Sequence, residues 1–564
     1  MADHPNQPGS PILLNLSKPP ITKSRTPRQL SSIQVGWLTA LFFALFLNSP
    51  FLSTLIELRG LEDWKDVAFL ISVIINLLAL TAILISLLAF PFLVRIWLIL
   101  LLISGATATY FSGKYGVLFD PTMIQNILET DFHEARELVN LNMALNVLTL
   151  GVVPAAVVVM LPVRFGSWPR EIGNTIMTLV IAAITICLVT FPFYKDYVFL
   201  FRQNRSIRHM VVPMGYLLSG YTVFADRFAP VENTVREPST PAVLGSSWTR
   251  AERKLVFVLV LGETARAANF SLGGYERLTN PKLSKKNVIY YDDIHSCGTT
   301  TAVSVPCLFA RSPRAAFDSS AEKLRDNALD IMKNAGLSVL WRDNNSGCKG
   351  VCDRVESQNM PIDDDDSLCN TGECFDMILL ESLQHEIEKH DDGLVIVLHQ
   401  KGSHGPAYVQ RAPDDFQVFL PSCKSSSLQE CTRTEIVNSY DNSILYTDHL
   451  LASLIDFLEA RSESLDTLVI YVSDHGESLG EKGLYLHGLP YAIAPDVQTH
   501  VPLIVWFSAG YLDRSGIEMP CVRAHAGDSY SHDNLFHTLL GAADVRSEVY
   551  QAAADIFSPC RRAG

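Results

Sequence analysis

Five runs of about 20 mostly apolar residues lie between residues 35 and 193 of this 564-residue chain. They cover residues 35–56, 67–90, 93–111, 144–163 and 172–193. A run of this length spans a bilayer as a helix, because inside lipid every backbone group has to be hydrogen-bonded within its own segment. The polar tail of residues 1–34 and the four later runs argue against a cleaved signal peptide. The sequence therefore predicts an N-terminal five-helix transmembrane domain.

Basic residues set the expected orientation of these helices. The tail 1–34 carries Lys18, Lys23, Arg25 and Arg28 against a single acid, Asp3. The loops after the second and fourth runs are basic too, whereas the loop between the third and fourth runs is acidic. Because positive loops stay in the cytoplasm, we expect a cytoplasmic N-terminus, and five crossings then place everything after residue 193 outside. A re-entrant run in place of one crossing would put the last domain on the other side.

A short segment separates the apolar runs from the rest of the chain. Residues 201–228 mix four arginines with aromatic and leucine side chains. This composition suits a helix in the lipid headgroup layer, and it fits a solvated linker as well. A proline-containing stretch, 231–243, leads into the last domain. We therefore expect a cytoplasmic tail at 1–34, a transmembrane domain at 35–196, a bridging segment at 197–245 and a soluble domain at 246–564.

The last domain alternates short apolar runs with helical stretches. The runs 255–261, 338–341, 394–398, 467–472 and 502–506 are unbroken, as is typical of parallel strands buried on both faces. Residues 435–460, which lie between two of them, have helical periodicity. This alternation predicts an α/β fold, in which helices cover a parallel sheet and ligands bind at the carboxyl ends of the strands.

Polar side chains follow three of these runs at the point where each ends. Glu263 comes after the first run, His399 and His404 come after the third, and Asp474 and His475 come after the fourth. Oxygen and nitrogen ligands of these kinds suit zinc. A single histidine after a strand is more often a simple hydrogen-bonding residue, but three converging strand ends favour a metal site.

A cluster of hydroxyl residues lies between Cys297 and Cys307. Composition alone favours an ordinary turn rich in serine and threonine. If a disulfide closes this loop and presses a threonine toward a metal ion, the metal would lower the pKa of the hydroxyl. That hydroxyl would then be a nucleophile near neutral pH.

Five motifs are specific in their combination and order: residues 263–266, 297–307, 399–406, 474–477 and 486–490. Together they resemble the motifs of the lipid A phosphoethanolamine transferase family, which includes the mobile colistin-resistance enzymes. The resemblance implies a C-terminal α/β domain of the alkaline-phosphatase and sulfatase type, in the periplasm, attached to the bacterial inner membrane by the multi-pass N-terminal domain. The nucleophile segment lacks the Cys-x-Pro-x-Arg motif that a sulfatase needs for its formylglycine, so we do not expect a sulfatase.

The resemblance also implies roles for single residues. Thr301 is the expected nucleophile, and the expected ligands of a zinc ion, Zn(2+), are Glu263, Asp474, His475 and the Thr301 hydroxyl. His404 and His487 are expected to contact the phosphoethanolamine group and to act as catalytic acid or base. The remaining substrate-binding positions that the resemblance implies are Lys349, His399, Asn126, Thr130 and Glu134, of which the last three lie in the membrane domain and are associated with the ethanolamine headgroup.

The implied reaction is a zinc-dependent transfer of phosphoethanolamine from phosphatidylethanolamine to lipid A through a phosphorylated threonine. It would lower polymyxin susceptibility, because each transfer adds an ammonium group to an anionic surface. The alternatives on the same fold are lipopolysaccharide core sugars, a periplasmic glycan or a protein as acceptor, and phosphoglycerol transfer. An inactive domain that serves as a membrane sensor is a more distant alternative. We expect a monomer among membrane lipids, and the net charge of −14 argues against nucleic acid as a partner.

The 11 cysteines fall mostly in close pairs, Cys297/Cys307, Cys348/Cys352, Cys369/Cys374 and Cys423/Cys431. Short disulfide-closed loops are expected in an oxidising periplasm. The spacing of the second and third pairs also fits a four-thiolate zinc site. Cys187 lies inside the fifth apolar run and is interpreted as a small apolar residue. Cys521 and Cys560 either pair with each other or stay free, and the sequence does not decide between these alternatives.

Overall fold

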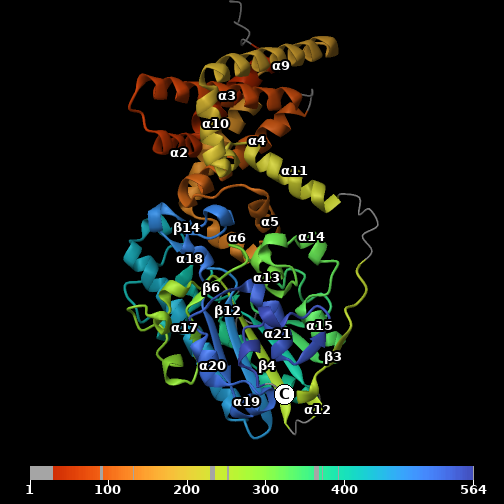
Figure 1. The fold of residues 1–564 in the computed structure, drawn as a ribbon. Coiled ribbons are helices and arrows are strands. Elements are labelled where there is room, and N and C mark those ends of the chain that lie inside the picture. The colour runs from red at the N-terminus through yellow and green to blue at the C-terminus, as the bar shows by residue number, and fades with distance from the viewer. Residues whose placement is uncertain are drawn as a thin grey trace, which may run out of the picture.

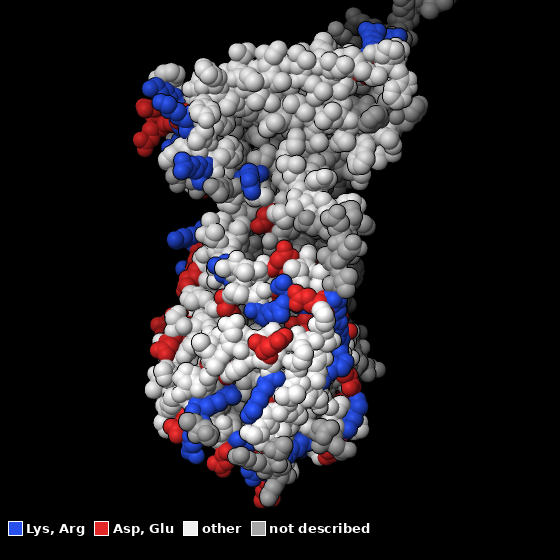
Figure 2. Space-filling view, turned by 45° about the vertical axis from the view of Figure 1, so that its right-hand side comes forward, with Lys and Arg blue, Asp and Glu red and all other residues white. Residues whose placement is uncertain are grey.

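The chain forms two parts that are stacked along one axis, a helical end and an α/β domain (Figure 1). The computed structural model describes residues 29–88, 93–130, 132–228, 236–249, 253–360, 367–370, 373–390 and 393–562, so the predicted tail lies outside the described residues up to residue 28. On the face in Figure 2, charged side chains are spread over the α/β domain and are sparse over the helical end. This contrast is expected where one part of a chain lies in lipid and the other in water.

Four helices among the described residues are long and apolar enough to cross a membrane. They are α3 (Trp64–Leu87), α4 (Val94–Tyr115), the continuous run Leu141–Met160 that includes α7 (Leu141–Val147) and α8 (Val153–Met160), and the run Trp168–Arg202 that begins with α9 (Trp168–Thr190) and continues into α10 (Tyr194–Gln203). They match the last four predicted spans, although Phe90, the predicted end of the second, lies outside the described residues.

The first predicted span is a bent pair of helices. Residues Ser32–Leu47, which begin with α1 (Ser32–Phe42), meet α2 (Ser49–Arg59) at an angle of 51°. Pro50 lies in the first turn of α2 and has no N–H to continue the helix. The Asn48 side chain donates to the carbonyl of Val212 at 2.7 Å and so fastens the bend to the bridging segment. The helical part therefore has five spans if this pair crosses as one broken helix, and four otherwise.

The bridging segment consists of η4 (Arg205–Met210) and α11 (Met214–Phe228). The α11 side chains of Leu218, Tyr221 and Phe224 are exposed, which favours the headgroup-layer interpretation over the solvated linker. Residues 229–235 of the predicted linker lie outside the described residues. The chain then enters the α/β domain through β3 (Ala242–Leu244), which pairs with β17 (Val545–Ser547).

The α/β domain is built on a mixed sheet of seven described strands in the order β5-β15-β12-β4-β11-β7-β8. All five predicted strands are present: β4 (Lys254–Gly262), β7 (Ser338–Asp343), β11 (Leu394–His399), β12 (Leu465–Ser473) and β15 (Leu503–Phe507). The added edge strands are β5 (Ile289–Tyr291) and β8 (Glu356–Asn359).

One predicted direction is wrong. Strands β12, β4, β11 and β7 are parallel, but β15 is antiparallel to β12. The chain leaves β12 at Ser473 and enters β15 from the same end of the sheet, so no crossover connection to the other end of the strands is needed. Because both faces of the sheet are covered, an antiparallel strand here is as continuously apolar as its parallel neighbours.

Two hydrophobic clusters sandwich the sheet. Phe257 and Leu259 of β4 face one cluster, which includes α15 (Ala328–Asn334) and α21 (Leu535–Ala542). Val256 and Val258 face the other, which includes α17 (Arg433–Glu459), the helix predicted at 435–460. A capping box between Thr432 and Glu435 begins α17.

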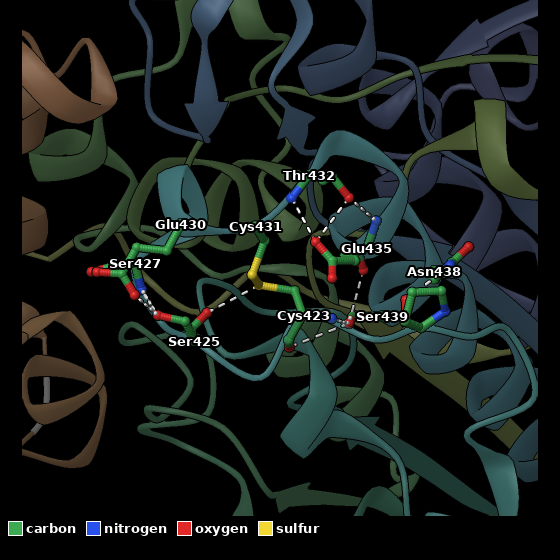
Figure 3. The surroundings of a disulfide bond; sticks show 10 residues. Cys423, Ser425, Ser427, Glu430, Cys431, Thr432, Glu435, Asn438 and Ser439 are labelled. Carbon is green, nitrogen blue, oxygen red and sulfur yellow. Dashed lines mark hydrogen bonds between the residues drawn. A yellow bond between two sulfur atoms is a disulfide. The ribbon is translucent and has the colours of Figure 1, made fainter.

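Disulfides close the four predicted pairs and also join Cys521 to Cys560. Because Cys348 bonds to Cys352 and Cys369 bonds to Cys374, the four-thiolate zinc site is wrong. Figure 3 shows the Cys423–Cys431 bond at the start of α17, with Glu430 in the loop that it closes. Of the described cysteines, Cys187 is free and lies exposed on α9.

Candidate active site

The three polar strand ends meet at one edge of the sheet, as predicted. β4 lies between β12 and β11, and the pairing aligns Ser473 with Gly262 and His399 with Leu261. Glu263 and Asp474, the next residues on two of these strands, are therefore neighbours.

Glu263, Asp474 and His475 form a buried cluster. One ligand atom from each lies within 4.8 Å of the other two. The His475 Nε2 atom is 3.4 Å from a carboxylate oxygen of each acid. Among the described residues, the Oδ2 atom of Asp474 has no hydrogen-bond partner although it is buried. A lone buried oxygen beside a second carboxylate is costly unless a cation lies between them, so the three side chains fit a divalent metal ion.

The charges of the cluster support this interpretation. Burial, together with the negative charge of Glu263, raises the pKa of Asp474. Burial opposes ionisation of Glu263 as well, but the imidazoles around it, His475 first, outweigh that effect and lower its pKa. A bound cation would stabilise the ionised form of both adjacent carboxylates. Their opposite pKa shifts are therefore consistent with a cation site.

Thr301 extends this cluster with a hydroxyl group. It is the first residue of α13 (Thr301–Phe309). Its Oγ1 lies 3.0 and 3.2 Å from the two carboxylate oxygens of Glu263 and 3.4 Å from Nε2 of His475. The Cys297–Cys307 disulfide closes the preceding loop onto the helix. The predicted nucleophile and the predicted ligands are thus brought together in one place.

His532, which the sequence did not single out, contacts the loop that precedes Thr301. Its Nδ1 accepts a hydrogen bond from the Cys297 N–H at 3.2 Å, and its Nε2 lies 3.0 Å from the Ser473 carbonyl. Burial lowers the pKa of His532 to about 3. A neutral imidazole therefore links the loop before Thr301 to the end of β12.

Two more predicted histidines lie beside the cluster. The ring centres of His475 and His487 are 4.4 Å apart, and those of His487 and His404 are 5.4 Å apart. His487 Nδ1 lies 2.8 Å from Glu477, whose other oxygen accepts a hydrogen bond from the Tyr408 hydroxyl at 2.7 Å. An imidazole held at Nδ1 in this way presents Nε2 for proton transfer.

Helix α5 (Pro121–Glu129) of the membrane domain forms part of the wall of a pocket that Thr301 also lines. The predicted residues that line it are Asn126, Thr130, Thr301, Lys349, His404 and His487, and they are joined by Glu129, Asn345 and Ser346. The Lys349 ammonium donates to the Ser346 carbonyl and hydroxyl at 3.0 Å and lies 4.0 Å from Glu129. The side chain of Glu134, also predicted here, lies outside the described residues.

Comparisons with known proteins agree with this geometry. The family model described as sulfatase matches residues 256–545, and the one described as phosphoethanolamine transferase EptA/EptB matches residues 77–228. Phosphoethanolamine transferase EptA of Escherichia coli strain K12 is 38% identical over 532 residues, which cover 94% of this chain and 97% of that protein. The chain belongs to the lipid A phosphoethanolamine transferase family.

Two further relatives of this transferase extend the match. Phosphatidylethanolamine transferase Mcr-1 of Escherichia coli is 34% identical, over 90% of this chain and 94% of its own length. A solved structure of the integral membrane lipooligosaccharide phosphoethanolamine transferase A from Neisseria meningitidis has a TM-score of 0.89 at 34% identity, and the match covers 95% of this chain and all of that one. The protein is therefore a transferase with an N-terminal membrane domain and a sulfatase-like C-terminal domain.

Asp343, Asn345 and Glu477 support the site of this transferase, and the sequence analysis assigned a role to none of them. His399 is fully buried, and its Nδ1 lies 2.9 Å from Asp343. Its Nε2 lies 3.3 Å from the amide nitrogen of Asn345, which donates to Glu263 at 2.9 Å. Asp343 and Asn345 come just after the apolar run 338–341, and this position at a strand end is the sequence signal that marks them. Glu477 is the last residue of the motif 474–477, to which the sequence analysis assigned a role only at Asp474 and His475.

Proposed function

We propose that this transferase moves phosphoethanolamine from phosphatidylethanolamine to a phosphate of lipid A through a covalent intermediate on Thr301. One observation carries the proposal: the Thr301 hydroxyl lies within 3.4 Å of Glu263 and His475, in a pocket that a membrane-domain helix completes. A hydroxyl beside a buried acidic cluster suits phosphoryl transfer. A wall from the membrane domain suits a lipid substrate. The Escherichia coli and Neisseria relatives are phosphoethanolamine transferases by name, which supports the same transferred group.

We assign Glu263, Asp474, His475 and the Thr301 hydroxyl as ligands of a zinc ion. The donor set of oxygen and nitrogen atoms fits zinc, and the buried Asp474 oxygen that lacks a hydrogen bond supports the presence of a cation. When bound, zinc supplies a Lewis acid that lowers the pKa of a coordinated hydroxyl and offsets negative charge on the transferred group. Asn345 and His475 hold the Glu263 carboxylate in place on its other sides.

The headgroup of the donor is proposed to lie between the two domains. Asn126, Thr130 and Glu134 would hold the ethanolamine part, and the Lys349 ammonium would neutralise the phosphate. His399 has no exposed surface, so its proposed contribution to substrate binding passes through Asn345, which lines the pocket. An anionic phosphate and a cationic amine thus meet side chains of opposite charge.

In the first half-reaction the ionised Thr301 oxygen attacks the phosphorus of phosphatidylethanolamine. A bond from phosphorus to the threonine oxygen forms, and the bond to the glycerol oxygen breaks. His404 or His487 donates a proton to the leaving diacylglycerol oxygen, a role that suits imidazole near neutral pH.

In the second half-reaction a phosphate oxygen of lipid A attacks the phosphothreonine. The same histidines, now deprotonated, would take the proton of the incoming group, and Thr301 is released. The two steps use one pocket in succession, so the kinetics are expected to be ping-pong.

The proposed location is the bacterial inner membrane, with the α/β domain in the periplasm. Tethering both the enzyme and its lipid substrates to one surface raises their effective concentration without any new contact. Each transfer would add an ammonium group to an anionic lipid, so we expect the modified cell surface to attract polymyxins less.

The test is a mass spectrum of lipid A from a Gram-negative host that expresses the chain, beside a Thr301→Ala control. Added phosphoethanolamine that is seen with the intact chain and is absent with the variant supports donor, acceptor and nucleophile together. Unmodified lipid A, with both proteins present in the membrane at equal levels, contradicts lipid A as the acceptor. The same samples are then searched for modified core sugars and glycans.

A further inference from the structure

Arg411, at the end of η10 (Tyr408–Arg411), lies where the two domains meet. It pairs with Glu137 of α6 (Phe132–Leu138) in the membrane domain and with Glu373 of β10 (Glu373–Cys374) in the α/β domain. In Figure 1, α6 lies between the helical end and the α/β domain. The Arg411 side chain exposes 2% of its surface and that of Glu137 exposes 10%. This ion pair is therefore buried and spans the domain boundary.

Arg411 has both of its direct ion-pair partners only when the domains are docked. Glu373 is shared, because the Lys401 ammonium lies 3.3 Å from its other oxygen. Arg411 and Lys401 thus form direct ion pairs with two carboxylates, one of which comes from the membrane domain, and Asp376 is a third carboxylate that acts on the guanidinium. Burial disfavours the charge on Arg411, but Glu137 and then Glu373 outweigh it and raise its pKa. Without Glu137, the buried guanidinium would keep one direct ion-pair partner, Glu373, which it shares with Lys401. Loss of one partner of a buried ion pair is strongly destabilising.

The same guanidinium also touches the active-site segment. Its Nε donates a hydrogen bond of 2.8 Å to the backbone carbonyl of His404. Three residues earlier, Lys401 belongs to the same strand-end segment, and its N–H and that of Gly402 are held by Asp376 at 2.8 Å. The segment is therefore fixed at one end by Asp376 and at the His404 end by Arg411.

From these contacts we propose that Arg411 is a positioning residue, which couples the docking of α6 to the placement of His404. Glu137 holds the guanidinium where its Nε meets the His404 carbonyl, so the imidazole is fully placed only when the membrane domain is docked. The inference rests on the proposed function, in which His404 moves a proton. It implies that the α/β domain reaches its full rate on a donor only when its own membrane domain is docked against it.

The chain provides a matched control contact across the same boundary. The Asn142 amide donates to Glu430 at 2.7 Å, in an exposed position. Glu430 sits in the loop that the Cys423–Cys431 disulfide closes, where Ser425 also bonds to it (Figure 3). This contact joins the domains without touching the His404 segment. Loss of Glu137 and loss of Glu430 therefore test the same boundary with and without the proposed coupling.

The experiment measures formation of the phosphoethanolamine adduct on the full-length protein in detergent. Two donors are compared, long-chain phosphatidylethanolamine in mixed micelles and monomeric dihexanoyl phosphatidylethanolamine. In both donors the same glycerol oxygen leaves the phosphorus, but the short-chain donor needs no membrane presentation. For Glu137→Gln we expect kcat to fall by at least about tenfold on both donors with little change in KM, because a small displacement of a catalytic group is enough for such a loss. Glu430→Gln should stay close to the intact protein on both.

Arg411→Gln and the double variant with Glu137→Gln complete the test. If the two residues act as one unit, the double variant is no slower than Arg411→Gln alone. Should Arg411→Gln fail to fold, Glu137→Gln carries the test, since it changes only the membrane-domain partner. The inference is overturned if Glu137→Gln raises KM for the long-chain donor and leaves the short-chain donor unaffected, or if it matches Glu430→Gln. No adduct on the intact chain with either donor counts instead against the proposed function.

Discussion

The Nδ1 atom of His487 lies 2.8 Å from a carboxylate oxygen of Glu477, and that carboxylate is fully buried. Its second oxygen accepts the Tyr408 hydroxyl at 2.7 Å. Carboxylate–imidazole pairs of this kind fix the tautomer and the orientation of the ring. The relationship makes Glu477 part of the active site although it does not line the pocket, and it gives a sharp test of the role of His487.

Glu477→Gln is expected to slow phosphoethanolamine transfer about 10- to 100-fold, the usual cost of losing such an outer partner. The glutamine amide can donate to Nδ1, which favours the wrong tautomer for proton transfer at Nε2. The rate of adduct formation on the full-length protein measures this loss. Tyr408→Phe keeps the carboxylate and serves as the milder control. A rate that Glu477→Gln leaves unchanged contradicts the role.

Thr301 is expected to form the covalent adduct. Thr301→Val has a similar volume but no hydroxyl, so its intact-protein mass after incubation with phosphatidylethanolamine should show no added phosphoethanolamine. Thr301→Ser keeps the oxygen but loses the methyl group that restricts it, so it should form the adduct at a rate reduced about 10-fold or more. An adduct on Thr301→Val at the rate of the intact chain would place the nucleophile elsewhere.

Removal of metal should destabilise the intact protein, because Glu263 and Asp474 are then left side by side in a buried site. We expect chelation to lower Tm by several degrees and added zinc to restore it, following the linkage between binding and stability. In Asp474→Asn the like charges are gone, so the Tm of this variant should respond much less to chelation. Metal analysis of the purified proteins should find zinc in the intact chain and not in Asp474→Asn.

Asp415→Asn, a substitution at an exposed position, serves as the control for the loss of one negative charge. It should behave like the intact protein. If the chelator lowers the Tm of Asp474→Asn as much as that of the intact chain, the metal is bound elsewhere.

The sequence predicted the parts of the fold that depend on burial alone. The runs at 255–261 and 467–472 are apolar on both faces, so their strand character needs no tertiary information. The direction of β15 does need it, because an apolar pattern is the same read from either end. Pro50 marks the bend in the sequence, but the contact that holds the bend in place joins Asn48 to Val212, 164 residues away. The Cys521–Cys560 pair depends on a fold that closes 39 residues of chain.

Some contacts of the candidate site could likewise be predicted from the strand pattern, and others could not. Glu263 and Asp474 follow neighbouring parallel strands, so their meeting could be predicted from strand order alone. His399 follows the third strand, yet its ring lies beside Asp343 and is fully buried. Side-chain direction at a strand end is set by local partners, which the strand pattern does not contain. The contact between Arg411 and Glu137 joins positions 274 residues apart and leaves no sequence signal.

His532 gives a prediction for the pH dependence of stability. Its pKa is about 3 in the folded protein because of burial and about 6.5 in the unfolded chain. Below pH 6.5 the unfolded chain therefore binds a proton that the folded protein does not, so stability falls as pH falls. Between pH 7 and pH 5 this one group should remove about 2 kcal/mol, or about 3 °C in Tm.

His532→Gln isolates this effect from the other titrating groups. The variant should be less stable than the intact protein at pH 7, because the glutamine cannot replace both the contact to the Cys297 N–H and the one to the Ser473 carbonyl. Its Tm should nevertheless fall less between pH 7 and pH 5, since glutamine does not titrate. Thermal unfolding of both proteins in detergent at the two pH values measures the difference. Equal losses in the two proteins would mean that the imidazole is already protonated, or exposed, in the folded state, and the neutral bridge between the nucleophile loop and β12 would then be wrong.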